Sequence, residues 1–269
     1  RPGGDVRPRP GGLAALSVAA AAARAGARVL LEGGLARRPG ETKSPGNFVT
    51  EADRNSEAEI VEVLAREAPG IPILAEEAGG TPAGTMWAVD PLDGTTNFMR
   101  GLPVVGVSVA LLRDGEPEVG VVIAPWLTLE FMAQRGHGAT LNGDPLPRLG
   151  PGDLSAAVLA TGFPFKAKDR LGRYLSMLEP AVERFEDLRR MGAAALDLSW
   201  TAAGSLDGFF ELGLAPWDVA AGATLVLETG GVVSDWSGGP GWLQSGDILA
   251  AAPAIHEKLV ELAGQPREG

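Results

Sequence analysis

Cysteine is absent from this sequence, which excludes disulfide bonds, thiolate nucleophiles and zinc sites built on sulfur. Histidine is nearly absent: His137 and His256 are isolated, so they form neither a zinc site nor a catalytic triad. Basic residues are also too few to balance the acidic ones, and the net charge is −11. Direct nucleic-acid binding is not expected, because a nonspecific binder needs a cationic surface.

Long apolar runs are missing too, since no uninterrupted run reaches the roughly 18 residues of a membrane helix. Residues 7–23 imitate a signal peptide, with a basic start followed by an alanine-rich stretch, but Arg24 and Arg28 interrupt the pattern. An alanine-rich helix over 13–33 explains the segment better, with a disordered tail at 1–12. We therefore expect a cytoplasmic protein without membrane contact.

The composition that is present, 45% apolar and 21% charged over 269 residues, is that of a globular protein with an ample core. Proline and glycine cluster at 145–153, which predicts a boundary between an N-terminal subdomain at 13–147 and a C-terminal one at 148–269. Periodicity predicts further helices at 52–67, 168–184, 192–203, 217–229 and 253–263, and strands at 71–75, 86–90, 104–113, 118–124, 129–134, 156–161, 186–190, 207–211, 231–235 and 248–252. This order suits a layered α/β fold.

The most informative segment is Trp87-Ala-Val-Asp-Pro-Leu-Asp-Gly-Thr-Thr-Asn-Phe98. An apolar strand leads into Asp90, and Asp93 follows on the same tight turn. Two carboxylates there suit a hard divalent cation, and Mg²⁺ commonly shares its ligands with a substrate phosphate. The amides after Gly94 can bind phosphate oxygens, particularly if a helix starts there. Taken alone, the pattern is also that of an ordinary surface turn.

Two further acidic sites favour the metal interpretation over four unrelated surface acids. Glu76 and Glu77 end a short apolar strand, and Asp218 follows Pro216-Trp217 at the expected start of a helix. Carboxylates at strand ends are where an open α/β sheet gathers a site.

These motifs resemble the signatures of the inositol monophosphatase family. The resemblance rests on Glu76-Glu77, on Asp90–Phe98 and on Trp217-Asp-Val-Ala-Ala-Gly222, in the family's order and separation. It extends from about residue 13 to about 262, and Thr161–Phe165 and Arg189–Leu198 are closest to the bacterial branch. It implies an αβαβα sandwich of the inositol monophosphatase / fructose-1,6-bisphosphatase type, and commonly a homodimer.

The resemblance also implies a ligand set. Two or three Mg²⁺ ions would be held by Glu76, Asp90, the Leu92 carbonyl, Asp93 and Asp218, with sensitivity to lithium. Two positions depart from the family pattern: Asn47 stands where an Asp is usual, and Lys43 is one residue out of register with the family lysine. The number of ions, two or three, therefore stays open.

The family positions its attacking water with a Thr backed by an Asp, helped by the first Glu of the acidic pair. These roles transfer to Thr95, Asp53 and Glu76. Asp53 is open to a second interpretation, as part of a helix cap, and the two roles are compatible.

Substrate contacts transfer to Asp93, Gly94, Thr95 and Asp218 on the phosphate side, and to Gly192, Ala193, Ala194 and Glu211 on the alcohol side. Glu211 can equally be an ordinary strand acid. Arg189 and Arg190 can bind phosphate, form a dimer contact or be a solvated pair at a strand end.

The implied activity is Mg²⁺-dependent hydrolysis of inositol 1-phosphate, or of a similar small phosphorylated alcohol or sugar, by a metal-activated water. Fructose-1,6-bisphosphatase, histidinol-phosphatase and 3′-phosphoadenosine 5′-phosphate phosphatase activities remain alternatives, because loops form the alcohol side of the pocket. A different class also remains: some bacterial relatives are partners of the transcription machinery, for which catalysis is dispensable.

Overall fold

The computed structural model describes residues 12–37, 39–44 and 47–264. The tail expected at 1–12 lies outside the described residues except for Gly12, which begins helix α1 (Gly12–Gly33). The side chains of Lys43 and Asn47, the two departures from the family pattern, also lie outside the described part.

The first sheet has seven strands in sequence order: β3 (Ile73–Ala75), β4 (Met86–Asp93), β5 (Gly106–Arg113), β6 (Glu116–Ala124), β7 (Leu129–Gln134), β8 (Gly138–Leu141) and β9 (Asp144–Pro145). β3 runs parallel to β4, and every later pair is antiparallel. The expected hairpin turn at Asp114-Gly115 joins β5 to β6, with both residues at positive φ.

The second sheet has five strands in the order β11-β10-β12-β14-β13. Its strands are β10 (Val158–Thr161), β11 (Asp187–Arg189), β12 (Gly208–Glu211), β13 (Val232–Ser234) and β14 (Ile248–Ala251). β10 is parallel to both neighbours, whereas β14 is antiparallel to β12 and β13.

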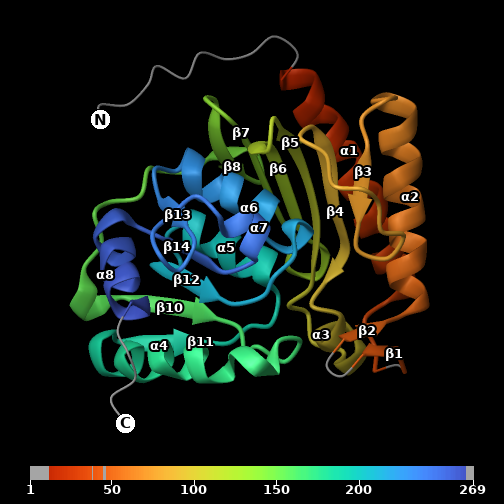
Figure 1. The fold of residues 1–269 in the computed structure, drawn as a ribbon. Coiled ribbons are helices and arrows are strands. Elements are labelled where there is room, and N and C mark those ends of the chain that lie inside the picture. Colours follow the sequence, from red (N-terminus) through yellow and green to blue (C-terminus); the bar gives the residue numbers. More distant parts are fainter. Residues whose placement is uncertain (1–11, 38, 45–46, 265–269) are drawn as a thin grey trace.

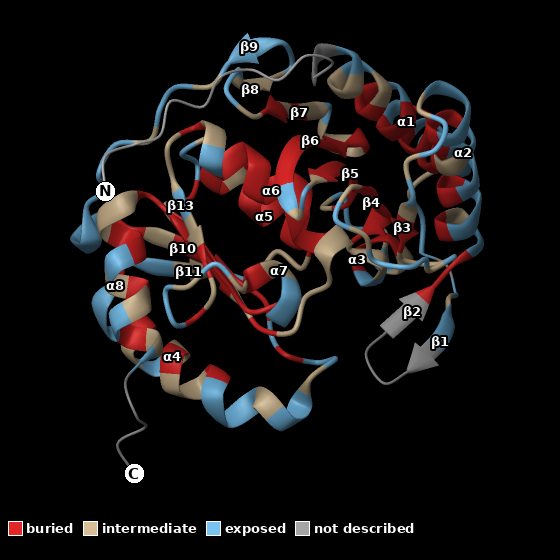
Figure 2. Cartoon of the chain, turned by 45° about the horizontal axis from the view of Figure 1, so that its top comes forward, coloured by how far each residue is buried: buried red, intermediate tan, exposed pale blue. Residues whose placement is uncertain are grey.

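Helices form three layers around these sheets (Figure 1). α1 and α2 (Glu51–Glu67) cover the outer face of the first sheet; α5 (Ala194–Ala202) and α6 (Pro216–Glu228) lie between the sheets; α4 (Leu171–Arg184) and α8 (Pro253–Ala263) cover the second sheet from outside. The result is the αβαβα sandwich that the family resemblance implies, and it agrees with the layered α/β fold that the order of elements predicts. Figure 2 shows α5 and α6 buried, whereas the outer helices expose one face.

Alanines let α1 pack closely on its neighbours. In α1 the buried side chains are mostly alanines, including Ala19, Ala22 and Ala23, and they pack with α2 and the first sheet. By length and composition alone, Ala14–Gly33 could cross a membrane. In this structure the segment is instead part of the core, as expected from the sequence.

Several short elements were not predicted. They are the hairpin of β1 (Glu41–Ser44) and β2 (Asn47–Val49), strand β9, helix α3 (Thr95–Arg100), helix α7 (Trp242–Ser245) and the 3₁₀ turns Pro125–Leu127 and Leu154–Ala156. The segment 136–143, expected as a turn region, contains β8, because Gly138 to Leu141 pair with β7. The helix expected at 168–184 divides into a 3₁₀ turn (Lys168–Arg170) and α4.

Candidate active site

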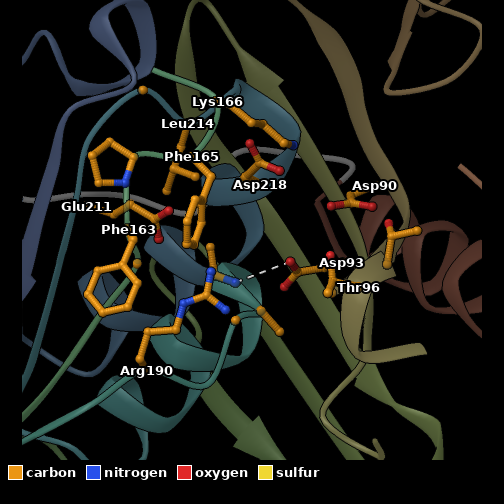
Figure 3. Close-up of a pocket in the computed structure, with 18 of the residues that line it drawn as sticks. Asp90, Asp93, Thr96, Phe163, Phe165, Lys166, Arg190, Glu211, Leu214 and Asp218 are labelled. Atoms are coloured by element: carbon orange, nitrogen blue, oxygen red, sulfur yellow. Dashed lines mark hydrogen bonds between the residues drawn. The ribbon is translucent and has the colours of Figure 1, made fainter. Parts of the chain in front are cut away.

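A pocket of about 350 Å³ contains nearly the whole predicted site (Figure 3). Every predicted site residue except Asp53 lines it: Glu76, Asp90, Leu92, Asp93, Gly94, Thr95, Gly192, Ala193, Ala194, Glu211 and Asp218. They come from the end of the first sheet, from the second sheet and from the two central helices. The fold thus brings together segments more than 100 residues apart in sequence.

Asp90 and Asp93 lie at the end of β4, where the strand leaves its regular pairing. The register with β5 shifts between these two residues, so both carboxylates can reach the pocket. The Leu92 amide donates to Asp90 Oδ1 at 2.9 Å, and the Ser56 hydroxyl donates to the Pro91 carbonyl at 2.9 Å. These bonds fix the turn that carries both acids.

Asp93 also joins β4 to the central helix α5. Its two carboxylate oxygens accept hydrogen bonds from the amides of Ala194 and Ala195, at 3.2 and 2.8 Å. Asn97 strengthens the same junction, because its side-chain amide donates to the Val104 and Met191 carbonyls at 2.8 and 2.9 Å. Ala194 is expected on the alcohol side of the substrate, and in this structure its amide donates to Asp93.

Asp218 lies in the first turn of α6, as the sequence predicts. Pro216 begins the helix, where its missing N–H costs no hydrogen bond. Asp218 Oδ2 accepts a hydrogen bond from the Ala215 amide at 2.6 Å, so the carboxylate is held at the helix start. Glu76 follows directly after β3 and also lines the pocket.

A buried residue of α2 organises the Glu76 segment. The carboxylate of Glu57 accepts hydrogen bonds from the amides of Glu77 and Ala78, at 2.8 and 2.7 Å. Sequence reasoning missed Glu57, because helical spacing alone cannot show which loop a buried acid contacts.

Thr95 and Asp53 are in direct contact, although they are 42 residues apart. The Thr95 hydroxyl lies 3.2 Å from Asp53 Oδ1, and 3.2 Å from the Leu92 carbonyl oxygen. Asp53 also caps α2, since its Oδ2 accepts from the backbone amide and the hydroxyl of Thr50. Both geometries considered for Asp53 thus coexist in one side chain.

The carboxylates of the pocket hold protons more tightly than exposed acids. Burial, and then the neighbouring Asp218, raise the pKa of Asp93 to about 7. Burial, followed by Glu76 and Asp93, raises the pKa of Asp90 well above its ordinary value. Burial also raises the pKa of Asp218. Such a set is poorly stabilised as anions, and a cation would relieve the repulsion.

Glu211 occupies the second-sheet side of the pocket. Burial, and then Asp218, raise the pKa of its carboxyl to about 8. The carboxyl packs against the backbone of Gly162, where a Cβ would lie 2.0 Å from its atoms. This environment differs from that of an ordinary exposed strand acid.

The donor chemistry fits a hard divalent cation. Four carboxylates and the Leu92 carbonyl offer only oxygen ligands, and Mg²⁺ typically takes one or two carboxylates together with waters and substrate phosphate. Among the described residues, no three His, Asp or Glu side chains close into a ready-made metal cage.

The pocket also contains residues that the motifs did not predict. Lys166 Nζ lies 3.9 Å from Glu76 Oε1. Burial tends to lower the pKa of Lys166, but Asp218, Glu76, Asp90 and Asp93 together raise it. Phe163 and Phe165 are partly exposed at the pocket, and the Arg190 guanidinium lies 5.6 and 5.7 Å from their rings. Arg190 was named from the sequence without a definite role.

Comparison with known proteins identifies the family. The model of the inositol monophosphatase family matches residues 13–267. The chain belongs to that family. Its members are Mg²⁺-dependent, in keeping with the oxygen donors of the pocket.

Relatives within the inositol monophosphatase family carry two kinds of name. The chain is 44% identical over 221 residues to "Nus factor SuhB" of Escherichia coli, covering 81% of this chain and 83% of that protein. The structure of "extragenic suppressor protein suhB" from Bartonella henselae has 35% identity and a TM-score of 0.88, covering 94% and 100% of the two chains. An inositol monophosphatase from Anabaena (Nostoc) sp. PCC 7120 has 36% identity and a TM-score of 0.81, covering 93% and 95%.

Proposed function

We propose that this protein is a Mg²⁺-dependent phosphomonoesterase that hydrolyses inositol 1-phosphate or a similar small phosphate monoester. The observation that carries the proposal is the pocket in which Glu76, Asp90, Asp93 and Asp218 converge beside the Thr95–Asp53 contact. Anionic side chains alone would repel a phosphate ester, so this pocket suits phosphate only with cations between the two.

The four carboxylates and the Leu92 carbonyl would hold two or three Mg²⁺ ions. When bound, these ions supply a lowered pKa for water and positive charge for the developing phosphoryl oxygens. The protein's part is to orient the reactants. The Thr95 hydroxyl donates toward Asp53 or Leu92, which leaves its lone pairs to accept a hydrogen bond from the attacking water. Glu76 is the second group assigned to that water.

The phosphate is assigned to the turn that follows Asp93. The amides of Gly94 and Thr95 would bind it, together with the cations that the carboxylates would hold. The alcohol is assigned to the opposite side, at Gly192, Ala193, Ala194 and Glu211. A protonated Glu211 can donate a hydrogen bond to a hydroxyl and an ionised one can accept, which suits a polyol leaving group.

A phosphate-release assay tests the proposal. Inositol 1-phosphate, fructose 1,6-bisphosphate, histidinol phosphate and 3′-phosphoadenosine 5′-phosphate would be compared with Mg²⁺ and with a chelator. We expect Mg²⁺-dependent release that Li⁺ inhibits and that Asp93→Asn reduces at least about a hundredfold. Undiminished turnover of that variant with metal still bound would overturn the site assignment. The preferred ester decides among the alternative activities.

A second function is favoured by the relatives named Nus factor SuhB. For this chain the corresponding role is that of a partner of the transcription machinery, independent of catalysis. Binding of the purified protein to purified transcription complexes would be compared for the wild type and Asp93→Asn. Equal binding by both would support the role, whereas no binding by either would exclude it.

We also propose that the protein is a cytoplasmic homodimer that binds neither membrane nor nucleic acid directly. We treat residues 13–147 and 148–269 as its two subdomains, with metal ligands in both. Light scattering after size-exclusion chromatography would give the oligomeric state, and a monomer mass would contradict this part of the proposal.

A further inference from the structure

Lys166 projects into the carboxylate side of the pocket. It follows strand β10 in the segment that also carries Phe163 and Phe165, and its ammonium lies 3.9 Å from Glu76 Oε1. Figure 3 shows the side chain extending above Asp218 toward the space that Asp90 borders. None of the sequence motifs assigns this lysine a role.

The carboxylates around it need a positive charge. Asp90, Asp93 and Asp218 are only 1, 7 and 8% exposed, and the Glu76 side chain is 10% exposed. Buried carboxylates of like charge that share one site are costly unless a cation compensates them. A lysine at this position supplies one positive charge that is permanently attached to the chain.

Lys166 is nevertheless not locked in place. Its side chain is 49% exposed, and 3.9 Å is longer than a charge-assisted hydrogen bond. A flexible four-carbon stem lets the ammonium withdraw toward solvent without moving the backbone. Its interaction with the carboxylates is therefore one that a stronger cation can replace.

We propose that Lys166 is a built-in counter-cation, which offsets part of the negative charge of the carboxylate cluster while no divalent cation is bound and competes with Mg²⁺ for it. This inference rests on the proposed Mg²⁺-dependent function. The proposal predicts the direction in which Mg²⁺ affinity changes when the lysine is replaced. Because the ammonium stabilises the metal-free pocket, it must weaken Mg²⁺ binding to the same extent. Removing its charge should tighten Mg²⁺ binding and destabilise the metal-free protein.

The test is calorimetric titration of Mg²⁺ into the metal-free wild type, Lys166→Met and Lys166→Gln. Both variants should bind Mg²⁺ roughly tenfold more tightly, a modest change because the lysine is half exposed. Their metal-free forms should unfold at lower temperature than the wild type. Lys166→Arg should remain close to the wild type in both measurements, because it keeps the charge.

Lys168 provides the matched control. It lies two residues further on, in the 3₁₀ turn Lys168–Arg170, and it does not line the pocket. Lys168→Met also removes one positive charge, but it does so outside the pocket. It should therefore leave the Mg²⁺ affinity near the wild-type value. An equal gain of affinity in Lys166→Met and Lys168→Met would mean that net charge alone is responsible, which would overturn the inference.

The remaining outcomes separate this inference from the proposed function. A wild type that binds no Mg²⁺ overturns both. Unchanged Mg²⁺ affinity in Lys166→Met and Lys166→Gln, with the wild type binding normally, overturns the inference alone. Unchanged affinity together with a raised KM for the phosphate ester would assign Lys166 to the substrate phosphate instead, and the counter-cation role would be wrong.

Discussion

At the residue scale, the two carboxylate oxygens of Asp53 make different contacts. Asp53 Oδ2 belongs to the cap of α2, whereas Oδ1 faces the Thr95 hydroxyl. The oxygen near the pocket is thus held by a helix end, which is a rigid support. In the proposed function, a hydroxyl oriented in this way positions the attacking water before the substrate arrives.

Thr95 and Asp53 should therefore act as one unit. Thr95→Ala and Asp53→Asn should each lower kcat strongly with little change in KM, because the interaction matters mainly in the transition state. The double variant should be scarcely slower than either single one. Steady-state kinetics on all three variants checks this, and fully multiplicative losses would contradict it. Asp53→Asn should also lower the free energy of unfolding by about 1 kcal/mol, because it weakens the cap of α2. Thr95→Ala leaves that cap intact.

Glu57 illustrates a residue that acts through another. Its two oxygens accept from the Glu77 and Ala78 amides, so Glu57→Gln would turn one acceptor into a donor facing an N–H group. We expect Glu76 to be less well oriented and Mg²⁺ affinity to fall about tenfold. Calorimetry measures this. Glu62→Gln, an exposed change in the same helix, is the control; equal affinities in both variants would mean that Glu57 is only structural.

At the scale of elements, close packing of α6 on the first sheet positions Asp218. A Cβ on Gly120 of β6 would lie 2.4 Å from the Ala221 carbonyl oxygen in α6, so this glycine sets the helix–sheet distance. Gly120→Ala should lower the free energy of unfolding by about 1–3 kcal/mol. Gly172→Ala, in α4 with open space around it, should be neutral or stabilise by about 1 kcal/mol. Denaturant melts compare them; equal stability of the two variants would contradict the packing argument.

The contact between α8 and β13 gives a prediction about pH. His256 is buried, and its Nε2 lies 2.8 Å from the Ser234 hydroxyl oxygen. Burial lowers the pKa of His256, although Glu257 partly offsets this. Below the ordinary pKa of about 6.5 the unfolded chain takes up a proton that the folded one resists, so stability falls as the pH falls. Above that pKa, His256 contributes no such dependence.

Acidic residues also change the stability of the protein between pH 7 and 5, so the contribution of His256 is obtained by comparing variants. Between pH 7 and 5 the stability of His256→Asn should fall less steeply than that of the wild type. His137→Asn, at an exposed position, should follow the wild type. Denaturant unfolding at several pH values provides the measurement, and parallel curves for all three proteins would contradict the prediction.

Elements with local signals could be predicted from the sequence, and those that depend on distant pairing could not. Alanine and leucine periodicity predicted α1 and α8, and Pro216 marked the start of α6. β8 was missed because the glycines of the segment 136–143 predict a turn, and only pairing with β7 makes part of that segment a strand. The family motifs predicted the four carboxylates that the structure brings into one pocket, Glu76, Asp90, Asp93 and Asp218. The contacts of Glu57 and Lys166 could not be predicted, because neither residue belongs to a motif.

At the scale of the whole molecule, the site lies where the layers of the sandwich meet. Asp90 and Asp93 come from the first sheet, Asp218 from the central helix α6, and Glu211 from the second sheet. Groups from three layers therefore depend on one another's position. A cation bound among them would connect layers that otherwise meet through alanine-rich packing and a few hydrogen bonds.

Mg²⁺ should consequently stabilise the fold as a whole. An ion that binds the folded chain alone contributes about 2.7 kcal/mol at a concentration of 100 Kd. For a chain of this size that corresponds to a rise of roughly 5 °C in Tm. Calorimetric melts with Mg²⁺ and with a chelator measure the rise. Asp93→Asn should lose most of it, whereas Asp144→Asn, an exposed acid of β9 outside the pocket, should keep it. A Tm that is insensitive to Mg²⁺ in the wild type would mean that the carboxylates do not bind the ion in the absence of substrate.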